Sequence, residues 1–241
     1  MSEWVEGVDN SVYQGSVSQA TWDALYAQGQ RVACVGSAHP RPNPYALENL
    51  RRAKQAGFLL ATYAVVYDSV RSAQTVGVAK QMCGEFWPEL RFVGVDCETP
   101  NITEAQIHGM VTAIEAEHLR PVIYTGAWWW QGHFGDSPAF KHLPLWTASY
   151  RNPANSDTVP LYGGWTRDKL IGHQWAGSVT LASTTVDRNN FVKEFIMPPP
   201  AGPTPEQRLL ALSWLANAAE AIAQGRPLTQ TQKDRLKFLG S

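Results

Sequence analysis

Two carboxylates follow directly on an apolar run at residues 93–98, which read Val-Gly-Val-Asp-Cys-Glu. If this run is a β-strand, Asp96 and Glu98 share one of its faces and Cys97 takes the other, packed face. Two neighbouring carboxyl groups cannot both ionise freely, so one pKa rises and a general acid is available near neutral pH. Hydrolysis of a glycosidic bond requires such a pair. The same spacing would also suit solvated loop acids or a cap for the following helix.

Two further acids, Asp9 and Asp187, are predicted at the ends of other strands. Asp9 stands in Gly-Val-Asp-Asn-Ser, a composition that also favours a turn, and Asp187 could instead form an ion pair with its neighbour Arg188. In a parallel β/α barrel the carboxyl ends of the strands meet at one mouth, where the active site lies. The four acids would therefore converge on one site if the chain forms such a barrel.

Short apolar strands alternate with helical stretches over most of the chain. Helices are predicted at residues 18–28, 43–55 and 71–83 and from a capping box that begins at Thr103. Strands are predicted at residues 5–9, 31–35, 58–67, 92–95, 121–125, 144–148 and 170–175. This alternation predicts an α/β fold, an irregular TIM-like β/α barrel whose last part has long loops and little helix.

The C-terminal part differs in composition from the rest. Residues 1–197 are predicted to form the catalytic barrel, residues 198–205 a stiff proline-rich linker, and residues 206–241 a short helical appendage of unknown role. Apolar residues at spacings of three and four give the first tail helix one apolar face. Self-association through these helices is therefore a further expectation.

The overall composition limits the classes of partner. The net charge of −1 gives no field that would attract nucleic acid or an anionic membrane, so neither partner is expected. No run of about 18 apolar residues is present, so no membrane insertion is expected. The six histidines show no HExxH motif or close pair, and we expect no metal and no cofactor. Ten Trp and eight Tyr are compatible with sugar stacking as well as with core packing.

Cysteine usage and the first residues bear on the compartment. Three cysteines without framework spacing do not predict disulfides. Residues 1–6 lack the basic and apolar regions of a signal peptide, so we expect synthesis and folding in a reducing cytoplasm. A target outside the cell would then require a separate route of delivery.

Several short motifs occur in the order in which they appear in one known family. They are residues 7–15 (Gly-Val-Asp-Asn-Ser-Val-Tyr-Gln-Gly), 95–98 (Val-Asp-Cys-Glu), 121–125 (Pro-Val-Ile-Tyr-Thr), 145–150 (Leu-Trp-Thr-Ala-Ser-Tyr), 174–175 (Gln-Trp) and 186–191 (Val-Asp-Arg-Asn-Asn-Phe). Each motif is short, but the ordered set, which spans about residues 4 to 193, resembles the family 25 glycoside hydrolases, the lysozymes of phages and bacteria.

The resemblance implies a barrel that cleaves peptidoglycan between N-acetylmuramic acid and N-acetylglucosamine with retention. Glu98 would be the general acid and base. Asp96 would stabilise the intermediate, either as nucleophile or by orienting the acetamido group of the substrate, and Asp9 and Asp187 would complete the acidic cluster. The residues that the resemblance assigns to substrate binding are Tyr13, Tyr63, Tyr124, Trp146 and Gln174.

The resemblance also implies a biological setting, a phage-type endolysin made in the host cytoplasm that acts on the wall after release through a holin-type pore or lysis. Two segments depart from the family pattern. Residues 36–40 read Gly-Ser-Ala-His-Pro where the family usually has a Lys and a polar stretch, and residues 63–65 read Tyr-Ala-Val instead of Tyr-His-Phe. Two alternatives therefore stand beside the muramidase: a weak or inactive wall-binding module of a phage particle, and an N-acetylglucosaminidase or chitinase-like enzyme.

Overall fold

The computed structural model describes residues 2–39, 41–68, 70–150 and 155–197, together with residues 218–219, 221–222, 224 and 227–230. The chain divides into two compact units, Met1–Met197 and Pro198–Ser241. The predicted linker and most of the predicted tail helices lie outside the described residues. Within the described residues, no helix has both the length and the apolar character needed to cross a membrane.

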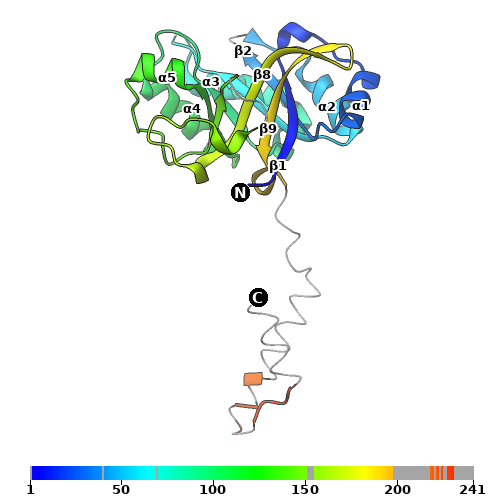
Figure 1. Ribbon diagram of the computed structural model, residues 1–241, viewed down its shortest axis with the longest axis vertical. Helices are drawn as coiled ribbons and strands as arrows, with labels where there is room; N and C mark the ends of the chain where they lie inside the picture. Colours follow the sequence, from blue (N-terminus) through cyan, green and yellow to red (C-terminus); the bar gives the residue numbers. More distant parts are fainter. Residues whose placement is uncertain are drawn as a thin grey trace. The chain divides into compact units, whose positions relative to one another are not determined.

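Eight strands of the first unit close into a barrel, which confirms the predicted irregular β/α barrel (Figure 1). They are β1 (Trp4–Asn10), β2 (Val32–His39), β4 (Leu59–Val65), β5 (Val93–Asp96), β6 (Pro121–Gly126), β7 (Leu145–Ala148), β8 (Leu170–Leu181) and β9 (Thr184–Val192). The order around the barrel is β1-β9-β8-β7-β6-β5-β4-β2, and β2 pairs back with β1. A short strand β3 (Arg41–Pro42) extends the end of β2.

One strand of the barrel runs against the others. β1, β2 and β4 to β8 are parallel wherever they neighbour one another, whereas β9 is antiparallel to both β8 and β1. The hairpin β8–β9 turns through Ala182 and Ser183, whose φ angles of 48° and 66° suit a tight turn. The prediction that Asp187 ends a strand is therefore wrong, because Asp187 lies within β9 and opposite Asp9 of β1.

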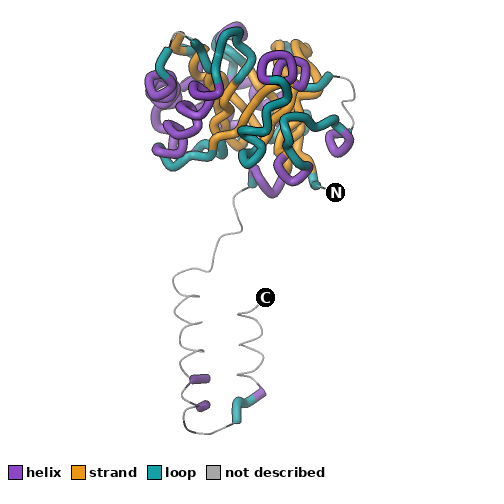
Figure 2. The backbone as a smooth tube through the Cα atoms, turned by 90° about the vertical axis from the view of Figure 1, so that its left-hand side faces the viewer, coloured by secondary structure: helices purple, strands orange, loops and turns teal. Residues whose placement is uncertain are grey.

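Helices cover the outside of the strands (Figure 2). They are α1 (Gln19–Ala27), α2 (Ala46–Ala56), α3 (Ser72–Cys83), α4 (Glu104–Ala116), α5 (Ala127–Phe134) and the short α6 (Lys193–Ile196). The predicted capping box is confirmed, since Thr103 N donates to Gln106 Oε1 at 2.7 Å and Gln106 N donates to Thr103 Oγ1 at 3.3 Å. Helix α2 begins later than predicted, because Asn43 accepts from Tyr45 N and so stabilises a turn before the helix.

The apolar core has two parts. A large cluster fills the layer between strands and helices and includes Cys97, as predicted for the face opposite Asp96 and Glu98. A second cluster fills the inside of the barrel around Phe92, Trp146 and Phe191. Small residues admit these rings: a Cβ atom at Gly172 would lie 2.7 Å from Cδ1 of Trp146. The barrel interior is therefore packed, and its aromatic side chains form a floor below the mouth.

Candidate active site at the barrel mouth

One pocket lies at the end of the barrel where the parallel strands finish. It is lined by Asp9, Ser11, Tyr13, His39, Tyr63, Asp96, Glu98, Tyr124, Trp146, Gln174 and Asp187. The structure thus brings together all nine residues proposed from the sequence, and it adds Ser11 and His39. Side chains from both ends of the first unit meet here because β1 pairs with β9 and closes the barrel.

The four acids reach the pocket by different routes. Asp9 lies near the end of β1, Asp96 is the last residue of β5, and Glu98 follows two residues later. Asp187 comes from the antiparallel strand β9 and is paired in register with Asp9. The side chain of Asp96 accepts a hydrogen bond from Glu98 N at 3.2 Å, which holds the end of the strand in a tight turn. Two of the acids therefore come from one strand end and two from a pair of adjacent strands.

The carboxyl groups differ in the donors that reach them. Oδ2 of Asp9 accepts from Asn189 Nδ2 at 2.7 Å and from Gln174 Nε2 at 3.0 Å. Asp187 accepts from Ser178 N at 2.6 Å and from Gln174 Nε2 at 3.3 Å. No donor among the described residues bonds to the carboxyl group of Glu98. Hydrogen bonds from the protein therefore favour the ionised form of Asp9 and Asp187, and they give Glu98 no such support.

The pKa of each acid is raised. Burial and then the charge of Asp187 raise the pKa of Asp9 to about 7, against the opposing effect of its two amide donors. Burial, followed by the charge of Asp187, raises the pKa of Glu98 to about 7. Burial and then the charge of Glu98 raise the pKa of Asp96 well above its ordinary value, and burial raises the pKa of Asp187. The cluster therefore retains protons at neutral pH and contains a usable general acid.

Aromatic side chains form the floor of the pocket. Trp146 is 1% exposed, and its ring centroid lies 4.4 Å from that of Tyr124 and 6.4 Å from that of Tyr63. Burial raises the pKa of both tyrosine hydroxyls well above its ordinary value, so they remain neutral. An apolar, rigid floor with a few hydroxyl groups suits the face of a sugar ring.

A second group of aromatic side chains lies at the rim. Tyr13 is 80% exposed, and its ring meets the edge of His39 with centroids 6.0 Å apart. His39 meets Tyr67 in the same edge-on manner, also at 6.0 Å. His39 was not proposed from the sequence, because it falls in a segment that departs from the family pattern and nothing in that segment marked it as a site residue.

Tyr150 was also missed. Its hydroxyl donates to Gln174 Oε1 at 2.7 Å, and burial followed by the charge of Asp187 raises its pKa to about 12. The residue closes the motif Leu-Trp-Thr-Ala-Ser-Tyr, so that motif could have indicated it.

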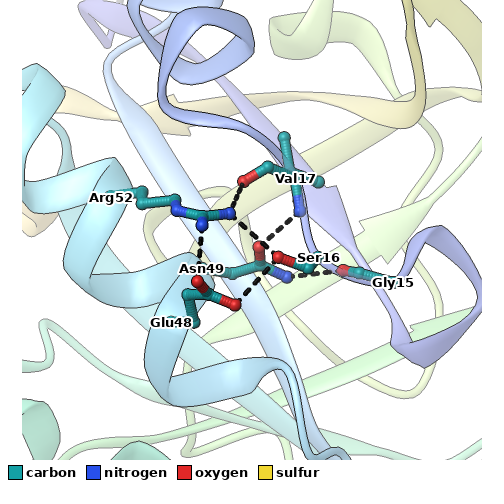
Figure 3. Close-up of polar contacts among 6 residues, drawn as sticks. All are labelled: Gly15, Ser16, Val17, Glu48, Asn49 and Arg52. Carbon is teal, nitrogen blue, oxygen red and sulfur yellow. Dashed lines mark hydrogen bonds and ion pairs between the residues drawn. The ribbon is translucent and has the colours of Figure 1, made fainter.

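A polar network holds the loop Gly15–Val17, which follows the rim residue Tyr13 (Figure 3). The buried side chain of Asn49 on α2 accepts from Val17 N at 2.9 Å and donates to Gly15 O at 2.9 Å. Arg52, one turn further along α2, donates to Val17 O at 2.7 Å and to Ser16 Oγ at 2.9 Å. The loop follows directly on the short 3₁₀ helix that contains Tyr13. The contacts with α2 therefore help to fix the position of Tyr13 at the rim.

No cluster of three or more His, Cys, Asp or Glu side chains suited to a metal ion occurs in the described part of the chain. The chemistry available to the pocket from the chain itself is that of carboxyl groups above an aromatic floor.

Comparisons with known proteins agree with the barrel fold. The family model of the glycosyl hydrolases family 25 matches residues 8–184. A search of curated protein sequences gives no match.

Solved structures of similar fold include muramidases, a lysozyme and endolysins. A muramidase from Acremonium alcalophilum is 21% identical with a TM-score of 0.60, over 78% of this chain and 93% of that one. The catalytic domain of endolysin ply40 from bacteriophage P40 of Listeria monocytogenes is 15% identical with a TM-score of 0.62, over 80% of this chain and 96% of that one. The modular Cpl-1 endolysin, solved with a peptidoglycan analogue, is 14% identical with a TM-score of 0.56, over 84% of this chain and 58% of that one. At these identities the likeness concerns the fold.

Proposed function

Because the chain belongs to family 25 of the glycosyl hydrolases, we propose that it is a lysozyme that hydrolyses the β-1,4 bond between N-acetylmuramic acid and N-acetylglucosamine. The observation that carries this proposal is the convergence of four carboxyl groups above an aromatic floor in one pocket. Peptidoglycan is the substrate class because the similar Cpl-1 endolysin was solved with a peptidoglycan analogue.

Glu98 is the proton donor in this proposal. Its pKa of about 7 keeps much of it protonated at neutral pH, and no N–H donor in the described residues holds it as a carboxylate. It can therefore give its proton to the glycosidic oxygen as the bond to the leaving sugar breaks. In the second half of a retaining reaction, the resulting carboxylate takes a proton from the attacking water.

Asp96 stabilises the positive charge that develops on the sugar. It is the last residue of β5, two residues before Glu98, and its side-chain oxygen accepts from Glu98 N, which fixes the two groups relative to each other. It acts either as nucleophile or by orienting the acetamido group of the substrate, and both routes give retention. Tyr63, Tyr124 and Trp146 form the surface against which the sugar ring lies, and Tyr13 adds a stacking face at the rim.

The setting that we propose is a phage-type endolysin. The support is the likeness to the catalytic domain of a bacteriophage endolysin. Such a protein is made in the host cytoplasm and reaches the wall through a holin-type pore or at lysis. Self-association through the C-terminal helices predicted from the sequence is a further part of the proposal, and light scattering during size-exclusion chromatography measures it directly.

The two departures from the family pattern are the basis for a binding-only alternative. Among the described residues of these altered segments, His39 is the one new member of the pocket lining, while Ala64 packs on the helix side of its strand. The four acids are all present, and so we place hydrolysis ahead of an inactive wall-binding module.

The test is turbidity loss of a purified peptidoglycan suspension together with the release of reducing ends. We expect the wild-type protein to clear the suspension and Glu98→Gln to lose about 10²–10⁴-fold in rate, because general acid catalysis contributes about that much. Glu115→Gln is the matched control, since Glu115 is exposed on α4 and is not among the pocket residues. Equal clearing by wild type and Glu98→Gln would defeat the proposal, and saccharide binding without new reducing ends would favour the binding module.

A further inference from the structure

Two buried amide side chains meet at one oxygen of the acidic cluster. Asn189 is 0% exposed and Gln174 is 2% exposed, and each donates an N–H group to Oδ2 of Asp9. Buried amides of this kind have little water to bond with, so their partners in the protein determine how they are oriented.

The orientation of the Asn189 amide is fixed by a tryptophan. Trp146 Nε1 donates to Asn189 Oδ1 at 2.8 Å, and an indole nitrogen can only donate. The carbonyl oxygen of Asn189 must therefore face Trp146, and its NH₂ group must face Asp9. If the amide were flipped, its NH₂ group would face the N–H of Trp146 and its oxygen would face Oδ2 of Asp9. Neither hydrogen bond could then form.

The Gln174 amide has all its near partners within the protein. Its Oε1 accepts from the hydroxyls of Tyr124 at 2.8 Å and Tyr150 at 2.7 Å. Its Nε2 lies between two carboxyl groups and donates to Asp9 at 3.0 Å and to Asp187 at 3.3 Å. Gln174 lines the pocket, but its hydrogen-bonding groups are directed at side chains of the protein.

We propose that Asn189 and Gln174 are positioning residues of the hydrolytic site, whose amide N–H groups favour the carboxylate form of Asp9 and so shift the protons of the cluster toward Asp96 and Glu98. This inference rests on the proposed function for its catalytic meaning, although the proton distribution itself can be measured without activity. A proton on Oδ2 of Asp9 would cost both hydrogen bonds. A proton on Oδ1 would leave Oδ2 as a neutral carbonyl oxygen, which accepts the two N–H groups more weakly than a carboxylate oxygen does.

The two amides determine the protonation of Asp9 because its other surroundings favour the protonated form. The titratable side chains that act on it or respond to its charge are Cys34, Tyr63, Asp96, Glu98, Tyr124, Tyr150 and Asp187, and His39 also lines the pocket. Burial and then the charges of Asp187 and Glu98 raise the pKa of Asp9, and no Lys or Arg of the described chain lines the pocket. The two amides are thus the groups that oppose its protonation.

The test is a titration of the side-chain carboxyl carbons by ¹³C NMR, in which Asp9→Asn identifies the resonance of Asp9. Asn189→Leu removes one donor at nearly constant volume, and we expect the titration midpoint of Asp9 to rise by about one unit, a ~10-fold change in proton affinity. Asn190→Leu is the matched control, because Asn190 is the next residue of β9 and its amide donates to Ser156 Oγ instead. An unchanged Asp9 midpoint in folded Asn189→Leu overturns the proposal.

A second variant guards against misfolding. Gln174→Met removes the other N–H donor to Asp9 without adding a charge, and we expect its Asp9 midpoint to rise as well, while Asn190→Leu leaves it unchanged. On peptidoglycan, the acid limb of kcat/KM in Asn189→Leu and Gln174→Met should move to higher pH by the same amount, since the proposal requires Asp9 as a carboxylate. If the midpoint rises but even the wild type releases no sugar, the positioning role holds and the proposed function fails. If the wild type hydrolyses peptidoglycan and the midpoint does not move, the positioning role fails.

Discussion

At the scale of single residues, the acids of the pocket are distinguished by their hydrogen-bond donors. Asp9 and Asp187 each accept two N–H groups, Asp96 accepts one, and Glu98 accepts none from the described residues. All four are raised in pKa by burial, so burial alone does not select the acid. At buried Asp9 the two N–H donors offset part of the effect of burial, so its pKa rises no further than that of half-buried Glu98, to about 7.

The raised pKa of Glu98 has a consequence for stability. The pKa of Glu98 moves from 4.5 to about 7 on folding, so the native state holds the proton of Glu98 more tightly than the unfolded chain does. This contribution to stability is complete below about pH 4.5 and is lost as the pH rises through about 7. Glu98→Gln cannot suffer this loss, so we expect it to match the wild type at pH 4 and to be more stable by about 1–3 kcal/mol at pH 8.

Thermal unfolding at the two pH values measures this difference. For a domain of this size the gain at pH 8 corresponds to an increase of several degrees in the melting temperature, about 2–4 °C per kcal/mol. Glu115→Gln serves as the control outside the cluster. A gain of equal size at pH 4 and pH 8 would show that the effect does not come from the ionisation of Glu98.

At the scale of elements, the sequence predicted which strand carries the acidic pair but missed part of how the acids meet. An apolar run ending in Asp-x-Glu and the period of two along a strand were enough to predict Asp96 and Glu98 on one side and Cys97 on the packed side, although β5 itself ends at Asp96. The reversed direction of β9 was missed, because a half-buried strand has the same alternation in either direction. Its turn at Ala182 and Ser183 lacks the glycine or asparagine that would indicate a tight hairpin in the sequence.

Asn49 and Arg52 of α2 both bond to the loop between Gly15 and Val17, and Asn49 is the buried one of the two. Asn49→Ala would leave Val17 N and Gly15 O without their partner, and we expect a loss of about 1–3 kcal/mol in the free energy of unfolding. Because this loop continues from the 3₁₀ helix that contains Tyr13, KM for soluble peptidoglycan fragments should rise several-fold while kcat changes less.

Urea denaturation and steady-state kinetics check both parts of this prediction. Gln55→Ala is the control on the same helix, since Gln55 is exposed. If Asn49→Ala lowers stability and leaves KM at the wild-type value, the rim does not depend on this anchor for substrate binding.

At the scale of the whole molecule, closure of the barrel makes the site. Asp9 belongs to the first strand and Asp187 to the last, and their pairing in register completes a cluster that also includes the end of β5. The sequence could predict a barrel from its alternating strands and helices, and the ordered motifs supplied the residues. It could not predict the amide contacts of Asn189, because they depend on side chains from strands far apart in the chain.

The most direct measurement of the central claim is mass spectrometry of borohydride-reduced products from purified peptidoglycan, with the wild type beside Glu98→Gln. The account predicts that the wild-type protein releases fragments ending in reduced N-acetylmuramic acid and that Glu98→Gln releases almost none. Fragments ending in reduced N-acetylglucosamine would contradict the assigned bond. Identical products at identical rates from both proteins would contradict the role of Glu98 as the acid that releases the sugar.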